Sequence, residues 1–195
     1  MIPGKSISDN PFLVEGTSAR LILVSGLPGS GKTYFADALT TALEAVHYNS
    51  DRLRSELNLR GHYDEASKQK VYDALLDSTS ESLGAGHTVI VDATLYLNQL
   101  RSPFLELAND LNVPLFWIEV HAEEAVIQER VQKSRPWSEA DFEVYQKIKA
   151  EYEPLNFKHL VLHSDSSPVE QMVHQAIYYL ERSNQPSSSS SYSSK

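Results

Sequence analysis

The apolar residues of the chain gather in five short runs, and longer segments with helical spacing separate these runs. Each run is largely apolar rather than alternately apolar and polar, which is typical of strands that are covered on both faces. The pattern therefore predicts the strands of a buried parallel sheet. The runs are Leu21–Val24, Val46–Tyr48, Thr88–Val91, Leu115–Val120 and Leu160–Leu162.

Two of the intervening segments carry the apolar stripe of an amphipathic helix, with apolar residues three and four positions apart. These segments span Val71–Leu83 and Val169–Leu180. Ser167-Pro168-Val169-Glu170 combines a cap, a first-turn proline and a capping-box glutamate, and it predicts a helix start. Ser138-Glu139-Ala140-Asp141 is a second possible capping box, and Gly84 with Gly86 predicts the end of the long helix.

Strands that alternate with helices predict right-handed crossovers and a parallel sheet between two helical layers, which is an α/β sandwich. The length of 195 residues suits one domain. We place this domain at residues 20–182, after an N-terminal extension at 1–19 that lacks a sustained period. Residues 183–195 are rich in serine and contain too little apolar surface to offset the entropy cost of ordering. We therefore expect a disordered tail there.

The segment after the first apolar run reads Gly26-Leu27-Pro28-Gly29-Ser30-Gly31-Lys32-Thr33 and has the Gly-x-x-x-x-Gly-Lys-Thr spacing of a phosphate-binding loop. A predicted strand precedes it and a predicted helix follows it, as the motif requires. The glycines allow backbone N–H groups to turn toward phosphates, and the helix start contributes its positive end. The residues expected to bind nucleotide are Gly26, Pro28, Gly29, Ser30, Gly31, Lys32, Thr33 and Tyr34.

Composition narrows the class of protein. No run approaches the roughly 18 apolar residues of a membrane span, and no signal peptide is evident, so we expect a cytoplasmic protein without a membrane partner. The absence of cysteine excludes thiol catalysis and disulfides. The net charge of −9 disfavours a large nucleic-acid surface, and no Asn-Lys-x-Asp guanine-binding tetrapeptide is present.

A carboxylate that can accept a hydroxyl proton follows the second predicted strand, in the stretch Val46–Leu57. Ligands of open α/β sheets bind at the carboxyl ends of strands, and Asp51 is expected there with Arg52 and Arg54 close behind it. A base beside a cation suits phosphoryl transfer to an alcohol. The structural alternative is that Asp51, or Ser50 before it, only caps the following helix.

Asp92 ends the third apolar run and is followed by Thr94. This is the expected place for a carboxylate that reaches Mg²⁺, directly or through water, or that reaches the acceptor hydroxyl. We expect the Thr33 hydroxyl on the same ion. The structural alternative is that Asp92 only forms a turn. Which of Asp51 and Asp92 would act as the general base stays open.

Cations gather again in the segment Glu129–Asp141, where Arg130, Lys133 and Arg135 precede Pro136. A mobile turn with cations over the nucleotide would act as a lid that neutralises the charge developing in the reaction. The structural alternative is a set of surface salt bridges with Glu129 or Glu139. We expect Trp137 to pack within this turn.

Together these motifs resemble small P-loop kinases. The resemblance rests on four motifs: the Gly-x-Pro-Gly-Ser-Gly-Lys-Thr loop, Asn49-x-Asp51-x-x-Arg54, the Val-x-Val-Asp-Ala-Thr strand end and the Arg130-x-x-x-x-Arg135 lid. The chain is similar to the predicted ATP-dependent kinases called AAA-family ATPases. More distantly, it is similar to the 5′-hydroxyl kinase domain of phage polynucleotide kinase and to zeta-toxin-type kinases. The resemblance covers roughly residues 20–182.

The resemblance implies a P-loop fold with five parallel strands in the order 2-3-1-4-5, and ATP and Mg²⁺ as cofactors. It implies that Lys32 binds phosphate and Thr33 magnesium, and that Asp51 is the general base for the acceptor hydroxyl. It assigns Arg54 to an acceptor phosphate, Asp92 to the strand-end acid, and Arg130 and Arg135 to the donor phosphates. Thr94 falls on the acceptor side of this arrangement.

Three functions are consistent with these residues. The first is an ATP- and Mg²⁺-dependent phosphotransferase that acts on a hydroxyl of a small molecule. The second is a polynucleotide 5′-hydroxyl kinase, for which Arg54 would grip a nucleic-acid phosphate. The third is a nucleotide-dependent switch without an acceptor. The residues are specific for nucleotide chemistry and name neither the acceptor nor the oligomeric state.

Overall fold

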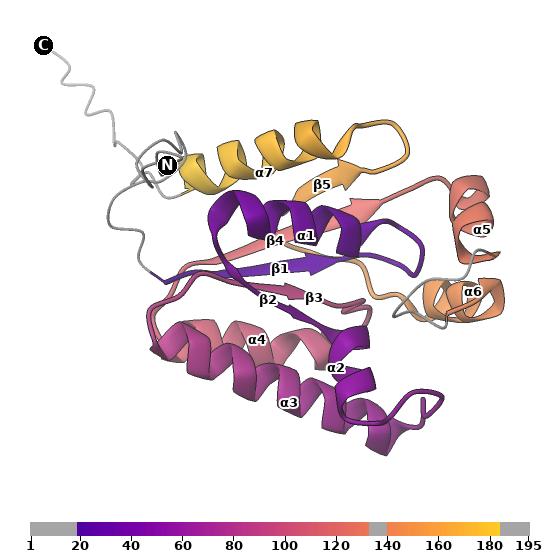
Figure 1. Cartoon of the computed structure of the whole chain (residues 1–195), viewed down its shortest axis with the longest axis horizontal. Helices are drawn as coiled ribbons and strands as arrows, with labels where there is room; N and C mark the ends of the chain where they lie inside the picture. Colours follow the sequence, from indigo (N-terminus) through magenta and orange to yellow (C-terminus); the bar gives the residue numbers. More distant parts are fainter. Residues whose placement is uncertain (1–18, 133–139, 184–195) are drawn as a thin grey trace, which may run out of the picture.

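A computed structural model describes residues 19–132 and 140–183 of the chain. The five predicted strands form one parallel sheet in the order β2-β3-β1-β4-β5 (Figure 1). The strand order that the resemblance implied is therefore confirmed. Four of the strands extend one residue past the predicted carboxyl end, and β3 is shifted by one. The strands are β1 Leu21–Ser25, β2 Val46–Asn49, β3 Val89–Asp92, β4 Leu115–His121 and β5 Leu160–His163.

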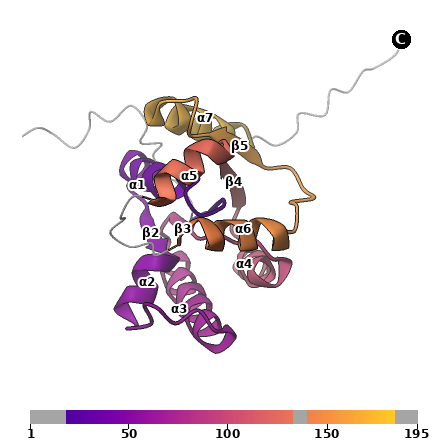
Figure 2. The same cartoon turned by 90° about the vertical axis from the view of Figure 1, so that its right-hand side faces the viewer.

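Helices cover both faces of the sheet, which confirms the predicted three-layer α/β sandwich. Helices α1 and α7 lie on one face, and α3 and α4 lie on the other (Figures 1 and 2). Helices α5 and α6 lie beyond the carboxyl ends of the strands, the edge that faces the viewer in Figure 2. The helices are α1 Lys32–Leu43, α2 Ser50–Glu56, α3 Glu65–Gly84, α4 Asn98–Asp110, α5 Glu124–Gln132, α6 Phe142–Glu151 and α7 Val169–Ser183.

The central strands are buried on both faces, as their continuous apolarity predicted. Every residue of β1 and of β3 is buried. The prediction was wrong for β5, where Val161 is 41% exposed. This strand is an edge strand, and α7 covers only one of its faces. The side chain of Val161 points to the other face, where no second helical layer lies against it among the described elements.

The predicted helix boundaries hold at α3 and α7. Helix α3 ends at Gly84, and Gly86 takes the left-handed φ of +89° that suits glycine. Helix α7 begins at Val169, directly after the predicted start signal. At α6, however, the N-cap is Asp141, whose carboxylate accepts the N–H of Val144. Asp141, the last residue of the predicted box, is thus the cap of this helix, whereas Ser138 lies outside the described residues.

Strand register decides which side chains meet at the carboxyl edge. Val24 pairs with Asp92 on one side of β1, and Ser25 pairs with Glu119 on the other. Successive side chains of a strand point to opposite faces. Asp92 therefore faces the α1 layer, as Ile90 does, whereas Glu119 faces the α4 layer. In the part of the chain that the structure describes, no helix is long and apolar enough to span a membrane.

Candidate active site

The phosphate loop joins β1 to α1, as predicted. Its last glycine, Gly31, is the N-cap of α1 with φ +89°, and no side chain caps the helix there. The first amides of α1 are thus left for an anion, which the positive end of the helix also attracts. At Gly26 a Cβ would lie 2.4 Å from the Val120 carbonyl oxygen, and at Gly31 it would lie 2.9 Å from Ser164 Oγ. Both positions therefore require glycine.

Arg130 and Ser164 hydrogen-bond to the backbone of the phosphate loop. Arg130 Nη1 donates to Ser164 Oγ at 2.8 Å and to the Gly29 carbonyl at 3.3 Å, while Nη2 donates to the Ser164 carbonyl at 3.0 Å. The Ser164 hydroxyl in turn donates to the Ser30 carbonyl at 2.5 Å. The described contacts of Arg130 are thus hydrogen bonds to the loop and to Ser164, and not the surface salt bridge of the structural alternative. The arginine instead braces the loop against the segment after β5.

The remaining loop residues divide into buried and exposed ones. Lys32 and Ser30 are buried, with exposed fractions of 9% and 1%, and Pro28 is buried as well. The Ser30 hydroxyl oxygen is buried and has no hydrogen-bond partner among the described residues. Tyr34 is 71% exposed at the start of α1. Its predicted contact with nucleotide stays a prediction.

Asp92 and Thr33 come together through Asn49. Asn49 Nδ2 donates to Asp92 Oδ2 at 2.5 Å and to Thr33 Oγ1 at 3.3 Å. Asp92 is fully buried, and His47 Nε2 lies 3.8 Å from its Oδ2. Burial by itself would raise the pKa of the Asp92 carboxyl. The neighbouring His47 ring, the Lys32 ammonium and the Thr33 hydroxyl outweigh burial and hold that pKa below its ordinary value.

This cluster has the donor set for Mg²⁺. Asp92 Oδ1 is buried and has no hydrogen-bond partner among the described residues, although a buried carboxylate oxygen without one is costly. An ionised carboxylate beside a hydroxyl and a phosphate loop is a typical arrangement for a magnesium ion that also binds substrate phosphates. The residues therefore fit the predicted cofactor, and Asp92 and Thr33 are the side chains that would hold it.

The helix that carries Asp51 is capped by another residue. The Asn49 side-chain oxygen accepts the N–H of Arg52 at 2.8 Å, which makes Asn49 the N-cap of α2. The alternative that Asp51 or Ser50 only caps this helix was therefore wrong. Asp51 lies in the first turn of α2, and its negative charge contributes to the raised pKa of the Tyr72 hydroxyl, for which burial is the main cause.

The two arginines that follow Asp51 have partners of their own. Arg52 Nη2 donates to both carboxylate oxygens of Asp37, at 2.9 and 2.8 Å. Arg54 is 8% exposed; its Nη1 donates to the His62 carbonyl at 2.5 Å, and its guanidinium lies 4.8 Å from the centre of the Tyr63 ring. Contact of Arg54 with an acceptor phosphate stays a prediction, and it would require Arg54 to exchange these partners.

The turn after β3 holds Thr94 next to a strained residue. Leu95 is buried with φ +49°, a rare conformation for a bulky residue. Arg101, itself buried, donates to the Leu95 carbonyl at 2.7 Å and to the Tyr96 carbonyl at 3.1 Å. Arg101 Nη2 also donates to the Glu153 carbonyl at 2.5 Å. One guanidinium thus fixes the turn that carries Thr94 and ties it to the segment after α6.

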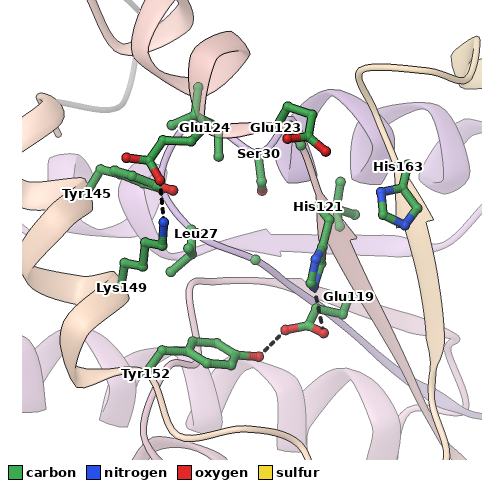
Figure 3. A pocket seen from close by; sticks show the side chains of 14 residues that line it. Leu27, Ser30, Glu119, His121, Glu123, Glu124, Tyr145, Lys149, Tyr152 and His163 are labelled. Carbon is green, nitrogen blue, oxygen red and sulfur yellow. Dashed lines mark hydrogen bonds and ion pairs between the residues drawn. The ribbon is translucent and has the colours of Figure 1, made fainter.

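A pocket of about 440 Å³ lies beside the phosphate loop, between the end of β4, α5 and α6 (Figure 3). Its floor is Glu119, which is 7% exposed. Glu119 accepts from Tyr152 and from His121 Nε2 at 2.8 Å, and His159 Nε2 lies 3.4 Å away. Burial would raise the pKa of the Glu119 carboxyl, but His121 and Tyr152 outweigh it and lower that pKa. No sequence motif predicted this cluster.

Two predicted residues, Arg135 and Trp137, lie outside the described residues, together with Lys133 and Pro136. Asn49 and Glu119 are the functional candidates that sequence reasoning missed. Asn49 stood within the quoted motif as its first residue. Glu119 was the one charged residue in the apolar run Leu115–Val120, and a carboxylate in a buried strand was the signal that could have found it.

Comparison with known proteins places the chain in a family. The family model described as an AAA domain matches residues 21–155, and the chain belongs to this family. An uncharacterized protein of Mycobacterium tuberculosis is 27% identical over 183 residues, which cover 87% of this chain. The match spans only 36% of that relative's own length, and the same figures hold for an uncharacterized protein of Mycobacterium bovis.

Solved structures share the fold at low identity. The APS kinase CysC of Mycobacterium tuberculosis, in complex with AMPPNP and APS, is 20% identical with a TM-score of 0.67, covering 84% of this chain and 98% of that one. A gluconokinase from Sinorhizobium meliloti is 20% identical with a TM-score of 0.64, covering 84% and 92%. Kti12 of Chaetomium thermophilum, in complex with ADP-AlF3, is 22% identical with a TM-score of 0.69, covering 85% and 100%. The chain therefore has the fold of the small P-loop kinases.

Proposed function

We propose that the protein is an ATP- and Mg²⁺-dependent phosphotransferase that moves the γ-phosphate to a hydroxyl of a small molecule. The observation that carries this proposal is the position of Asp51. Its helix is capped by Asn49, whose side chain also contacts Asp92 and Thr33. A carboxylate is thereby held at the same sheet edge as the phosphate loop, and the task of capping the helix is left to Asn49.

The proposed roles follow from charge and position. Lys32 and the loop amides hold the β- and γ-phosphates, because they are the cation and the donors nearest the start of α1. Magnesium, held by Asp92 and Thr33, would supply charge neutralisation at the phosphates. Asp51 orients the acceptor hydroxyl and takes its proton late in the transfer. Arg135 stabilises the charge that develops on the transferred group.

Charge supports a small acceptor over a polynucleotide. Arg54, the residue assigned to a nucleic-acid phosphate, is engaged by the His62 carbonyl and the Tyr63 ring. The chain carries a net charge of −9, and anionic polymers require several phosphate contacts for useful affinity. The gluconokinase and the APS kinase among the structural neighbours are named for the phosphorylation of small molecules, which agrees with this choice.

The test is production of ADP from Mg-ATP with acceptor pools added one at a time. The pools are nucleosides, sugars, polyols and 5′-hydroxyl oligonucleotides. The proposal predicts that one small-molecule pool raises turnover and that mass spectrometry finds a phosphorylated product in it. A rise with oligonucleotides alone would replace the proposal by a polynucleotide kinase. Unchanged turnover with every pool would favour a nucleotide-dependent switch.

A further inference from the structure

The pocket above Glu119 adjoins the phosphate loop. Gly26, Leu27 and Ser30 of the loop line the pocket together with Tyr145 and Lys149 of α6. Figure 3 shows Leu27 beside these two side chains of α6. Ser30 is 1% exposed, and among the described residues its hydroxyl has no hydrogen-bond partner. A buried polar group without a partner is rare in proteins. A ligand in this pocket would supply one.

The pocket also lies on the side of the sheet where Asp51 is expected to act. Glu119 faces the α3 and α4 layer, the layer that holds Tyr72. Burial raises the pKa of the Tyr72 hydroxyl, and the negative charge of Asp51 adds to this rise, which places Asp51 near Tyr72. The Tyr96 carbonyl accepts the N–H of Glu153 at 2.9 Å, directly after Tyr152 of the pocket. The turn after β3, which carries Tyr96, therefore lies between the pocket and the Tyr72 side chain that is close to Asp51.

The cations that line the pocket already have carboxylate partners. Lys149 pairs with Glu124, and His121 donates to Glu119. Glu123 adds another carboxylate to the lining. Among the described side chains of the pocket, the carboxylates of Glu119, Glu123 and Glu124 outnumber the two cations, Lys149 and His121. An anionic ligand would therefore meet net negative side-chain charge, and the one ammonium is already paired. Anionic groups buried against carboxylates are strongly disfavoured.

The same lining suits hydroxyl groups. Glu119 offers the remaining lone pairs of its carboxylate, and Tyr152, Ser30 and His163 offer groups that donate or accept hydrogen bonds. Leu27 and the ring of Tyr145 supply apolar surface between these polar groups (Figure 3). Small-molecule sites typically combine an apolar lining with a few polar groups that fix orientation.

We propose that this pocket binds the acceptor and selects an uncharged, hydroxyl-rich molecule of the sugar or polyol class against its phosphorylated or otherwise anionic counterpart. The inference rests on the proposed function, because only that function makes the ligand of this pocket an acceptor. Glu119 is the specificity-determining residue of the pocket. The carboxylate holds acceptor hydroxyls, while its charge and that of Glu123 repel anions.

The test uses matched probes that differ in charge. Neutral pentoses, hexoses and hexitols and their terminal monophosphates are titrated into the full-length chain with Mg-ADP, by calorimetry and by ligand-observed saturation-transfer NMR. The variants are Glu119→Gln and Tyr152→Phe, which remove the charge or one hydroxyl with little change of shape. Tyr178→Phe on α7, where the residue is 58% exposed, is the matched control. Circular dichroism shows that each variant is folded.

We expect at least one neutral probe to bind, its monophosphate to bind at least tenfold more weakly, and Glu119→Gln to weaken the neutral probe by about tenfold or more. The control should leave binding unchanged. Tighter binding of the phosphates, binding that is insensitive to both pocket variants, or failure of every neutral probe would overturn the inference. Phosphate transfer is assayed in parallel. Pocket-dependent binding without transfer would contradict the proposed function alone, whereas transfer to an anionic acceptor, unaffected by Glu119→Gln, would contradict the pocket alone.

Discussion

Asn49 and Asp92 lie 43 positions apart in the sequence, and the Asn49 side-chain amide donates to the Asp92 carboxylate at 2.5 Å. The oxygen of the same amide caps helix α2. One side chain therefore sets both the direction of the buried carboxylate and the start of the helix that carries Asp51. In the proposed mechanism, the metal side and the acceptor side of the site therefore share this residue.

Replacing Asn49 by alanine should disturb the metal side more than the fold. Side chains that hydrogen-bond to metal ligands typically contribute about 10- to 100-fold in metal affinity. We expect a comparable rise, about tenfold or more, in the Mg²⁺ concentration for half-maximal ATP turnover. Loss of the cap should cost about 1 kcal/mol of unfolding free energy. Asp64→Ala, which removes the cap of α3, is the control. An equal rise in Mg²⁺ requirement in both variants would refute the positioning role.

Gly31→Ala should abolish tight nucleotide binding. The backbone φ of +89° is strained for alanine by about 1–2 kcal/mol, and the new Cβ would lie 2.9 Å from Ser164 Oγ. Gly84→Ala is the matched control, because no atom lies within 4 Å of its Cβ position. That control should gain about 0.5–1 kcal/mol in stability. ATP affinity measured by calorimetry should fall only in Gly31→Ala, and equal affinity in the two variants would contradict the loop geometry.

Replacing the two arginines of the lid motif should affect different properties, ATP binding in one case and turnover in the other. Arg130 binds the Gly29 carbonyl and Ser164, so Arg130→Ala should weaken ATP binding by loosening the loop. Arg135→Ala should instead lower turnover, by about 10³-fold if it stabilises the transition state, with little change in ATP affinity. Steady-state kinetics measures the turnover of each variant, and nucleotide titration measures its ATP affinity. An unchanged turnover in Arg135→Ala would remove that residue from the lid.

The pocket cluster should give the stability of the protein two pH limits. His121 has a raised pKa, chiefly through its hydrogen bond to Glu119, and Glu119 has a lowered one. The groups that face them are Tyr152, His159 and the His163 ring, whose centre lies 5.8 Å from that of His121. Stability from the raised pKa is complete below the ordinary histidine value of 6.5. It is lost as the pH rises through the folded value.

The lowered pKa acts in the opposite direction. Stability from Glu119 is present above its ordinary value of 4.5 and is lost as the pH falls through the folded value. We therefore expect the contribution of the pair to be largest between these two limits. Urea unfolding of wild type and His121→Gln across pH 4 to 8.5 measures it, with the alkaline loss absent in the variant. Parallel pH profiles for both proteins would show that the pair contributes nothing.

Much of the fold could be predicted because it depends on local patterns. Continuous apolar runs gave the strands, and the glycine spacing located the phosphate loop between β1 and α1. The exposure of Val161 could not be predicted, since a strand's apolarity does not reveal whether it lies at the edge of the sheet. The strand order came from resemblance, because periodicity carries no information about which strands are neighbours.

The contacts of the site were harder to predict for a physical reason. Asn49 was only the first residue of a motif, with no role of its own, and its partner Asp92 becomes a neighbour only when β2 and β3 pair. Arg54 looked available for a phosphate, but the chain folds back so that the His62 carbonyl and the Tyr63 ring engage it. The cap of α6 could not be chosen from the sequence, because Ser138 and Asp141 are both good capping residues.

The most direct test of the account compares phosphate transfer and ATP binding in Asp51→Asn. Glu56→Gln, an exposed position at the end of the same helix, is the control. With an acceptor that raises turnover in wild type, single-turnover transfer should fall by about 10²-fold or more in Asp51→Asn. ATP affinity should stay within about twofold in both variants, since Asp51 is assigned to the acceptor. Transfer at the wild-type rate in Asp51→Asn would contradict the central claim that this carboxylate is the general base of a kinase.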